Sequence, residues 1–405
     1  MKIRSMRLFI IVLLSTIFIF SMQYGLSAVM MKLFDTTKGF SKGTIVGAVD
    51  IGGEVKEQAE ADLGKKTEAW VSESRIQLVY QDVVIAIPAS MFIFDVVDSI
   101  QHVQNGKHTP LTVSINKEEL QTLLLDKLNG EIAAKLDMKK LEGELLKAAA
   151  SFTPKMNVPV ISLLDQAGSK KTVAQGTVLG ATKYTGLQQW AEQYATLTVP
   201  PKSEVSLAKL VKEKNVQADN ETLSVLATLM YKTILPTNFQ VRQRSISLHL
   251  PPYAELGEEA RFEKNRADFV FYNPNETPYI LKFELTDNTA RLFVEGLPFV
   301  HVYAVNRQEI SSIPKQTVVE AVMANGAKHD AVVPQSSGED GYVVKVYREL
   351  YRSNGSFVKR EKMAEDYYLP TNQVKWALVQ PRTQPVTPST AAPQTGSNQS
   401  GVSEQ

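Results

Sequence analysis

An uncharged, strongly apolar run near the N-terminus constrains this chain more than any other feature of its sequence. The run covers residues 8–31 (LFIIVLLSTIFIFSMQYGLSAVMM), and three cations precede it: Lys2, Arg4 and Arg7. A helix needs about 20 mostly apolar residues to cross a bilayer, and cations favour the cytoplasmic side. We therefore expect residues 1–7 to form a basic cytoplasmic head and residues 8–31 an uncleaved transmembrane signal anchor. The chain would be a single-pass protein of the cytoplasmic membrane, N-in/C-out, with its bulk extracytoplasmic.

A cleaved signal peptide is the alternative interpretation of this run. Ser27 and Ala28 are small enough for a cleavage site, but Leu26 fits an A-x-A pattern poorly, and the run is long for a signal peptide. The chain has no cysteine, which excludes a lipoprotein anchor, disulfides, a thiol nucleophile and a zinc–thiolate site.

The charge balance argues against a nucleic-acid ligand. The 405 residues include 44 basic and 43 acidic ones, a formal net charge of +1, whereas nucleic-acid binders normally carry a basic surplus. Hydrophobic residues make up 43% and charged residues 21%, which are ordinary values for a chain that buries cores. The length suits two or three domains.

Periodicity predicts an α+β fold that begins after a polar linker at residues 32–43. In the first domain, residues 44–152, the stretch VDIGGEVKEQAEADL is typical of a short strand, a Gly-Gly turn and a helix, with Gly64 as its C-cap. The strands RIQLVY, VVIAIPA and LTVSI follow, and then a helix capped by Asn116 and another at about residues 137–151.

A second mixed α/β domain is expected at residues 153–300. Its helix should run from Asn220 until Pro236 ends it, and strands dominate afterwards. Residues 301–376 read as a small β-rich module, because alternating residues flank Asn354-Gly355, a strong hairpin signal. Residues 377–405 are rich in Pro, Thr, Ser and Gln and should form a disordered tail.

Several stretches resemble a family of bacterial envelope proteins. VGAVDIGGEVKEQAEADL is similar to the start of the peptidoglycan-binding type of domain that precedes VanW-like domains. LGATKYTG, AEQYATLTVPPKSEVSLAKLV, LSVLATLMYKTIL and ADFVFYNPNETPYILKFELTDNTARLFVEGL resemble the VanW-like domain itself, and the hairpin GYVVKVYRELYRSNGSFVKREKMAEDYYLP resembles the β-tail that often follows it. The resemblance covers residues 45–372 and implies a wall-facing protein that contacts peptidoglycan or another envelope component.

The family's Gly-Gly-Gly-x-Cys-Gln motif is missing from this chain. Asn220, Glu221 and Thr222 stand near the glycines, and Leu223 or Ser224 near the cysteine; VRQRS keeps Arg242 but has no histidine. The VanW-like domain at residues 153–300 is therefore degenerate, which is typical of a chemically silent branch.

No recognisable active site emerges from the other reactive residues. Of the five histidines only His102 and His108 lie close together, without metal-binding spacing, in what reads as a surface loop. The acidic stretch ELGEEARFEKNRAD is interleaved with basic residues, as in a solvated loop. An L,D-transpeptidase domain would need a cysteine. We expect no catalytic residue, no metal and no cofactor.

The hairpin supplies the one candidate binding surface, a strip of basic and aromatic residues: Lys345, Tyr347, Arg348, Tyr351 and Arg352. Such a strip could contact an anionic wall polymer or a protein partner. The alternative is a solvated edge hairpin whose charges discourage edge-to-edge pairing.

These observations predict a membrane-anchored extracytoplasmic binding protein of the bacterial cell envelope, which contacts peptidoglycan or a wall-associated partner without catalysis. One alternative is a structural subunit of an envelope assembly, such as a secretion, pilus or sporulation apparatus. The other is an envelope enzyme with a carboxylate site that the sequence does not reveal.

Overall fold

The chain mixes helices and strands, as predicted. A computed structural model describes residues 39–165, 169–323 and 335–379, with 29% helix and 36% strand in several sheets. Within these ranges, no helix is both long and apolar enough to span a bilayer. The expected anchor at residues 8–31 and the tail beyond residue 379 lie outside the described residues.

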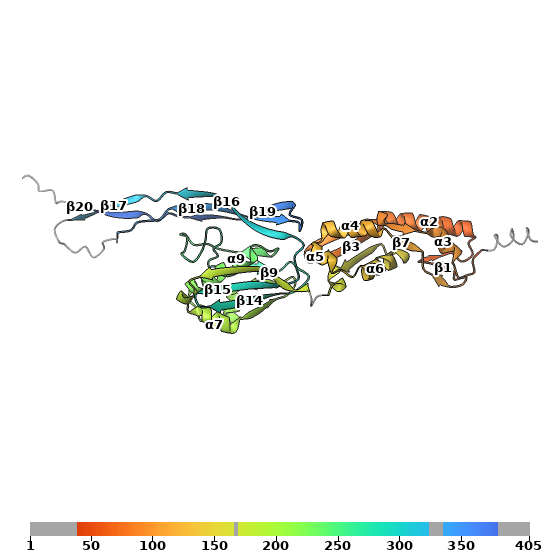
Figure 1. Ribbon diagram of the computed structural model, residues 1–405, viewed down its shortest axis with the longest axis horizontal. Helices are drawn as coiled ribbons and strands as arrows, with labels where there is room; N and C mark the ends of the chain where they lie inside the picture. The colour runs from red at the N-terminus through yellow and green to blue at the C-terminus, as the bar shows by residue number, and fades with distance from the viewer. Residues whose placement is uncertain (1–38, 166–168, 324–334, 380–405) are drawn as a thin grey trace, which may run out of the picture.

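Two hydrophobic cores organise the molecule into two bodies, and a long β arm follows them (Figure 1). The first body comprises residues 39–165, the second body residues 169–300, and the arm residues 301–323 and 335–379. The short strand β1 (Ile45–Val46) lies at one end of the row, and the tip of the arm lies at the other.

The first body packs its helices against three small sheets, ordered β2-β1-β6, β4-β3-β8 and β5-β7. Its remaining strands are β2 (Val49–Asp50), β3 (Arg75–Tyr80), β4 (Val83–Ile87), β5 (Phe92–Phe94), β6 (His108–Thr109), β7 (Val113–Ile115) and β8 (Lys155–Pro159). Its α-helices are α2 (Lys56–Glu73), α3 (Val96–Gln101), α4 (Lys117–Lys127), α5 (Gly130–Ala134) and α6 (Met138–Ala150), and its 3-10 turns are η1 (Ala89–Met91) and η2 (Val160–Leu163).

Helix α2 does not end at Gly64, contrary to the sequence prediction. Its buried stripe continues from Leu63 to Thr67 and Trp70, and the Trp70 ring meets that of Phe92 edge-on with 5.2 Å between centroids. A glycine inside a helix costs only about 1 kcal/mol relative to alanine, whereas burying a large aromatic ring contributes more. The cap of α4 is confirmed, because the side chain of Asn116 accepts a hydrogen bond from the Glu119 backbone.

Residues 153–165, assigned above to the second domain, belong to the first body. Strand β8 pairs in parallel with β3, and Val158 and Leu163 are buried in the first core. This long-range pairing has no local sequence signal, because a parallel partner can come from anywhere along the chain. At the other end of the body, Phe40 from the expected linker at residues 32–43 packs against the same core.

The second body is built around one buried helix, α9 (Asn220–Ile234), which lies against β9 and β15. The Asp219 side chain caps α9 by accepting a hydrogen bond from Thr222 N at 2.7 Å, and Pro236 follows its end, as expected. The sheets run β10-β14-β15-β9 and β11-β13-β12. The other elements are β9 (Lys171–Leu179), η4 (Ala181–Lys183), α7 (Gly186–Gln193), β10 (Thr196–Val199), β11 (Glu204–Ser206), α8 (Leu207–Glu213), β12 (Gln240–Gln243), β13 (Val270–Tyr272), β14 (Tyr279–Thr286) and β15 (Thr289–Gly296).

The arm has a wide base and a narrow tip. Strands β16 (Val302–Ile313), β18 (Gly341–Tyr351) and β19 (Phe357–Tyr368) form the base in the order β16-β18-β19, and β17 (Thr317–Met323) pairs in parallel with β20 (Gln373–Val379) at the tip. The Asn354-Gly355 hairpin is confirmed, with Gly355 at φ +84°. Strand β20 also takes in residues 377–379, which were expected to begin the disordered tail.

Residues 301–376 were expected to form a separate module, but the base of the arm packs against the second body. Val344, Val346 and Tyr368 of this base belong to the second core, so one side of the sheet is covered by the second body. The opposite side faces solvent.

A tightly packed joint connects the two bodies. Leu297 and Val300, which follow the last strand of the second body, are buried in the first core, while Phe299 between them belongs to the second core. The hydroxyl of Tyr80 donates a hydrogen bond to the Pro298 carbonyl at 2.8 Å. The joint therefore fixes the first body relative to the second body and to the base of the arm.

Candidate functional site

The solvent side of the arm base is the surface most suited to binding. Side chains alternate across a strand, so residues opposite one another on neighbouring strands share a side of the sheet. We call this side the arm face; it comprises Val302, Ala304, Asn306 and Gln308 of β16, Lys345, Tyr347, Glu349 and Tyr351 of β18, and Phe357, Arg360, Lys362 and Glu365 of β19.

A hydrogen-bond network holds the middle of the arm face in place. Glu349 is only 6% exposed, and its carboxylate accepts hydrogen bonds from Asn306 Nδ2 (3.0 Å), the Tyr351 hydroxyl (2.6 Å) and Arg360 Nη2 (2.6 Å). The Tyr351 hydroxyl, and after it the Arg360 guanidinium, hold the pKa of Glu349 below its usual range. The carboxylate is therefore ionised and already paired, so it leaves the surface pre-organised for a ligand.

Around this network the arm face presents aromatic and aliphatic groups beside cations. The Arg360 guanidinium lies 5.3 Å from the centroid of the Tyr347 ring, and Phe357 meets Tyr351 edge-on. Phe357 is 56% exposed and Val302 is 53% exposed. Three cations (Lys345, Arg360 and Lys362) face two carboxylates (Glu349 and Glu365) on this surface. Such a surface can stack against flat apolar groups and attract anionic ones.

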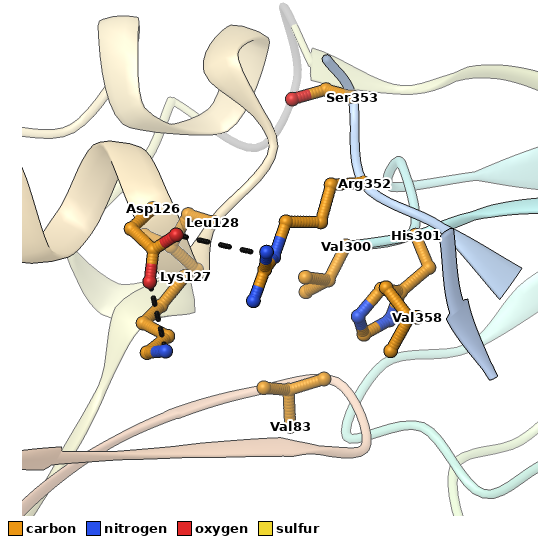
Figure 2. Close-up of a pocket in the computed structure, with 9 residues that line it drawn as sticks. All are labelled: Val83, Asp126, Lys127, Leu128, Val300, His301, Arg352, Ser353 and Val358. Atoms are coloured by element: carbon orange, nitrogen blue, oxygen red, sulfur yellow. Dashed lines mark ion pairs between the residues drawn. The ribbon is translucent and has the colours of Figure 1, made fainter. Parts of the chain in front are cut away.

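The structure places only three of the five residues of the predicted strip on the arm face. Lys345, Tyr347 and Tyr351 lie together on the arm face. Arg348 and Arg352 do not lie on the arm face, for two different reasons. Arg348 follows Tyr347 directly in a strand and so points to the opposite side of the sheet. Arg352 follows the last residue of β18 and extends toward the first body (Figure 2).

Arg348 is a structural residue rather than part of a binding surface. It is 7% exposed, and its guanidinium donates hydrogen bonds to the carbonyls of Thr237 (2.5 Å) and Phe239 (2.8 Å) and to the Glu361 carboxylate (2.8 Å). Thr237 and Phe239 lie just beyond α9. Arg348 therefore attaches the arm base to the second body.

Four important residues of the arm face were missed from the sequence: Asn306, Glu349, Arg360 and Lys362. Counting symmetrically across the Asn354-Gly355 turn places Tyr347 opposite Lys362 and Glu349 opposite Arg360, as the structure has them. The turn was therefore a sufficient signal for the β19 residues. Asn306 lies on β16, whose register on β18 no local turn determines.

The acidic stretch around residues 255–263 lies among cations in the structure, as its sequence indicated. A cavity of about 200 Å³ beside it is lined by Glu255 and Glu258, but both pair with Lys232 and Arg307. In the described part of the chain, no cluster of three His, Asp or Glu side chains could hold a metal ion. His102 is exposed beside Asp98, and His108 contacts the Gly47 carbonyl from strand β6.

Comparison with known proteins assigns no family to this chain. No protein-family model matches it, and no curated protein is similar to it. The interpretation of the arm face therefore depends on its own chemistry and on the resemblance given above.

Proposed function

We propose that this chain is a membrane-anchored extracytoplasmic binding protein of the bacterial cell envelope, which contacts peptidoglycan or a wall-associated partner without catalysis. In this proposal residues 8–31 form the single transmembrane helix, the first body (residues 39–165) is the peptidoglycan-binding type of domain, and the second body (residues 169–300) is a degenerate VanW-like domain. The apolar run with its preceding cations supports the anchor, and the quoted stretches support the family resemblance.

The arm face is the observation that carries the binding proposal. Strand β18 has 11 residues, and at about 3.3 Å per residue it spans roughly 36 Å, long enough for several units of a polymer. Glu349 holds the Tyr351 ring and the Arg360 guanidinium of the arm face in place. These side chains therefore lose little conformational entropy when a ligand binds. In Figure 1 the strands that carry this surface lie away from β1, the short strand that follows the proposed anchor in sequence.

Co-sedimentation of the full chain with isolated cell-wall sacculi tests this proposal. The double variant Tyr347→Ala/Lys362→Gln removes a central ring and a cation from the arm face. We expect its affinity for sacculi to fall about tenfold, because truncating a central aromatic anchor typically costs at least 1–2 kcal/mol. Binding by the unmodified chain should weaken as salt increases, since part of the attraction is electrostatic.

The second body offers a matched control. Arg242 lies 4.8 Å from the centroid of the Tyr272 ring, the same kind of pair as Arg360 with Tyr347. Tyr272→Ala/Arg242→Gln should bind sacculi like the unmodified chain. Equal losses in the two double variants, or no sedimentation of the unmodified chain, would reject wall binding through the arm face. Crosslinks from the arm face to one protein, without sacculus binding, would instead favour a subunit of an envelope assembly.

A further inference from the structure

A small pocket lies where the turn of the arm hairpin meets the first body. Its volume is about 100 Å³, and side chains from the first body, the joint and the hairpin line it (Figure 2). The apolar part of its wall consists of Val83, Leu128, Val300 and Val358, and the polar part of Asp126, Lys127, His301, Arg352 and Ser353. We call it the joint pocket. It is separate from the arm face.

Arg352 projects into the joint pocket, and its side chain is 43% exposed, so its donors are accessible to a ligand. Figure 2 shows its guanidinium between the first-body helix that carries Asp126 and the ring of His301. Asp126 Oδ1 is 3.9 Å from Arg352 Nε, which is too long for a hydrogen bond. The Asp126 carboxylate instead pairs with Lys127 at 2.8 Å. Apart from its long ion pair with Asp126, the Arg352 guanidinium forms no side-chain hydrogen bond with another described residue, so its planar fork of five N–H donors can exchange water for a ligand.

The side chains that line the joint pocket carry a net charge of +1, which one negative charge on a ligand would balance. Lys127 and Arg352 supply two positive charges against the single carboxylate of Asp126. The hydrogen bond and charge of Lys127 hold the pKa of Asp126 below its usual range, so this carboxylate is ionised at neutral pH. Burial lowers the pKa of His301 by more than the nearby Asp82 carboxylate raises it. The cations of Lys359 and Arg352 act in the same direction as burial, so the ring is neutral at neutral pH. The site therefore balances a monoanion better than a dianion.

From this geometry we propose that the joint pocket binds the carboxylate of a ligand with a small aliphatic substituent, through a two-point contact with Arg352. A guanidinium and a carboxylate fit each other as two parallel N–H···O hydrogen bonds. The four aliphatic side chains take the substituent. An adjoining cavity of about 360 Å³, which shares His301 and is lined by Phe299, Tyr303, Asn129 and Lys171 among others, accommodates a longer chain that ends in the carboxylate.

Calorimetric titration of the full chain in detergent micelles with N-acetylalanine tests the proposal, and N-acetylalaninamide serves as the uncharged control ligand. Arg352→Gln should weaken N-acetylalanine binding about tenfold, and Arg352→Lys should lie between, because lysine keeps the charge but loses the fork. Arg291→Gln, an exposed arginine of β15, is the control variant. The carboxylate has two chemical sources, the C-terminus of a peptide and a free small acid, and N-acetyl-trialanine distinguishes them. If the site takes a peptide terminus, N-acetyl-trialanine should bind more tightly than N-acetylalanine. If the site takes a free small acid, it should bind more weakly.

A second pair of variants keeps the test independent of Arg352. Val358 is partly exposed at the pocket wall, so Val358→Glu places a carboxylate beside the guanidinium without disturbing a core. This variant should lose N-acetylalanine binding, whereas Val358→Gln should keep it within about twofold. The proposal is overturned if Arg352→Gln binds like the unmodified chain, if the amide binds as well as the acid, or if inorganic phosphate binds more tightly than N-acetylalanine.

Discussion

Glu259 is a carboxylate that the fold buries without a cationic partner. It is completely buried; its Oε1 accepts a hydrogen bond from Ser247 N at 2.9 Å, but Oε2 has no hydrogen-bond partner among the described residues. The nearby Tyr368 hydroxyl is also unsatisfied, and the Arg244 guanidinium is occupied by Asp366. Burial therefore raises the pKa of Glu259 above its ordinary value of 4.5.

This raised pKa makes stability depend on pH in a definite direction. The folded state holds the Glu259 proton more tightly than the unfolded state, so the contribution is fully present below pH 4.5 and is lost as pH rises through the raised pKa. Glu259→Gln removes the charge. At pH 8 the variant should unfold with a free energy about 1–3 kcal/mol higher than the unmodified chain, because it buries no charge and each unit of pKa shift corresponds to about 1.4 kcal/mol.

Urea unfolding at several pH values checks this prediction. The difference in unfolding free energy between Glu259→Gln and the unmodified chain should shrink as pH falls toward 4.5. Glu276→Gln is the control, because the Glu276 carboxylate is exposed and pairs with Lys202 at the surface. A difference for Glu259→Gln that stays constant with pH would show that the Glu259 charge is not its cause.

At the scale of elements, Arg348 links the arm base to the second body. Arg348→Met leaves the carbonyls of Thr237 and Phe239 and the Glu361 carboxylate without its hydrogen bonds. We expect the free energy of unfolding to fall by about 2–4 kcal/mol, because hydrogen bonds to a buried charge are among the strong ones. Hydrogen exchange should also accelerate in β18 and β19 before it does in β9 and β15.

The neighbouring cation Lys359 supplies the control for this element. Its ion pair with Glu361 is exposed, so Lys359→Met should change the free energy of unfolding by about 0–1 kcal/mol. Equal effects of the two substitutions would contradict the structural role of Arg348.

Local signals predicted the elements well, and long-range packing accounts for the differences. The Asn354-Gly355 turn, the Asn116 cap of α4 and the end of α9 before Pro236 lie where the residues indicated, because each depends on neighbours in the sequence. The extension of α2 depends on Trp70 meeting a distant phenylalanine, and the place of β8 depends on pairing with β3. The candidate sites show the same contrast. Strand alternation could have separated Tyr347 from Arg348, but the joint pocket brings together four segments that are distant in the sequence, so it has no local signature.

At the scale of the whole molecule, the joint makes the second body contribute to the stability of the first. Leu297 belongs by sequence to the end of the second body, yet it is 2% exposed inside the first core. Leu297→Ala should lower the free energy of unfolding of the first body by about 2–4 kcal/mol, through lost burial and a residual cavity. Native-state hydrogen exchange should show the loss in α6 and β3, with little change in β14.

Val294, only three positions earlier, provides the mirror-image control, because its side chain is buried in the second core. Val294→Ala should reduce protection in β14 and β15 and leave α6 and β3 unchanged, since each substitution creates a cavity in a different core. If both substitutions lowered protection equally in both bodies, the molecule would unfold as one cooperative unit. The opposite patterns expected here would show that one short segment after β15 stabilises the first body and, through it, holds the joint pocket and the arm in place.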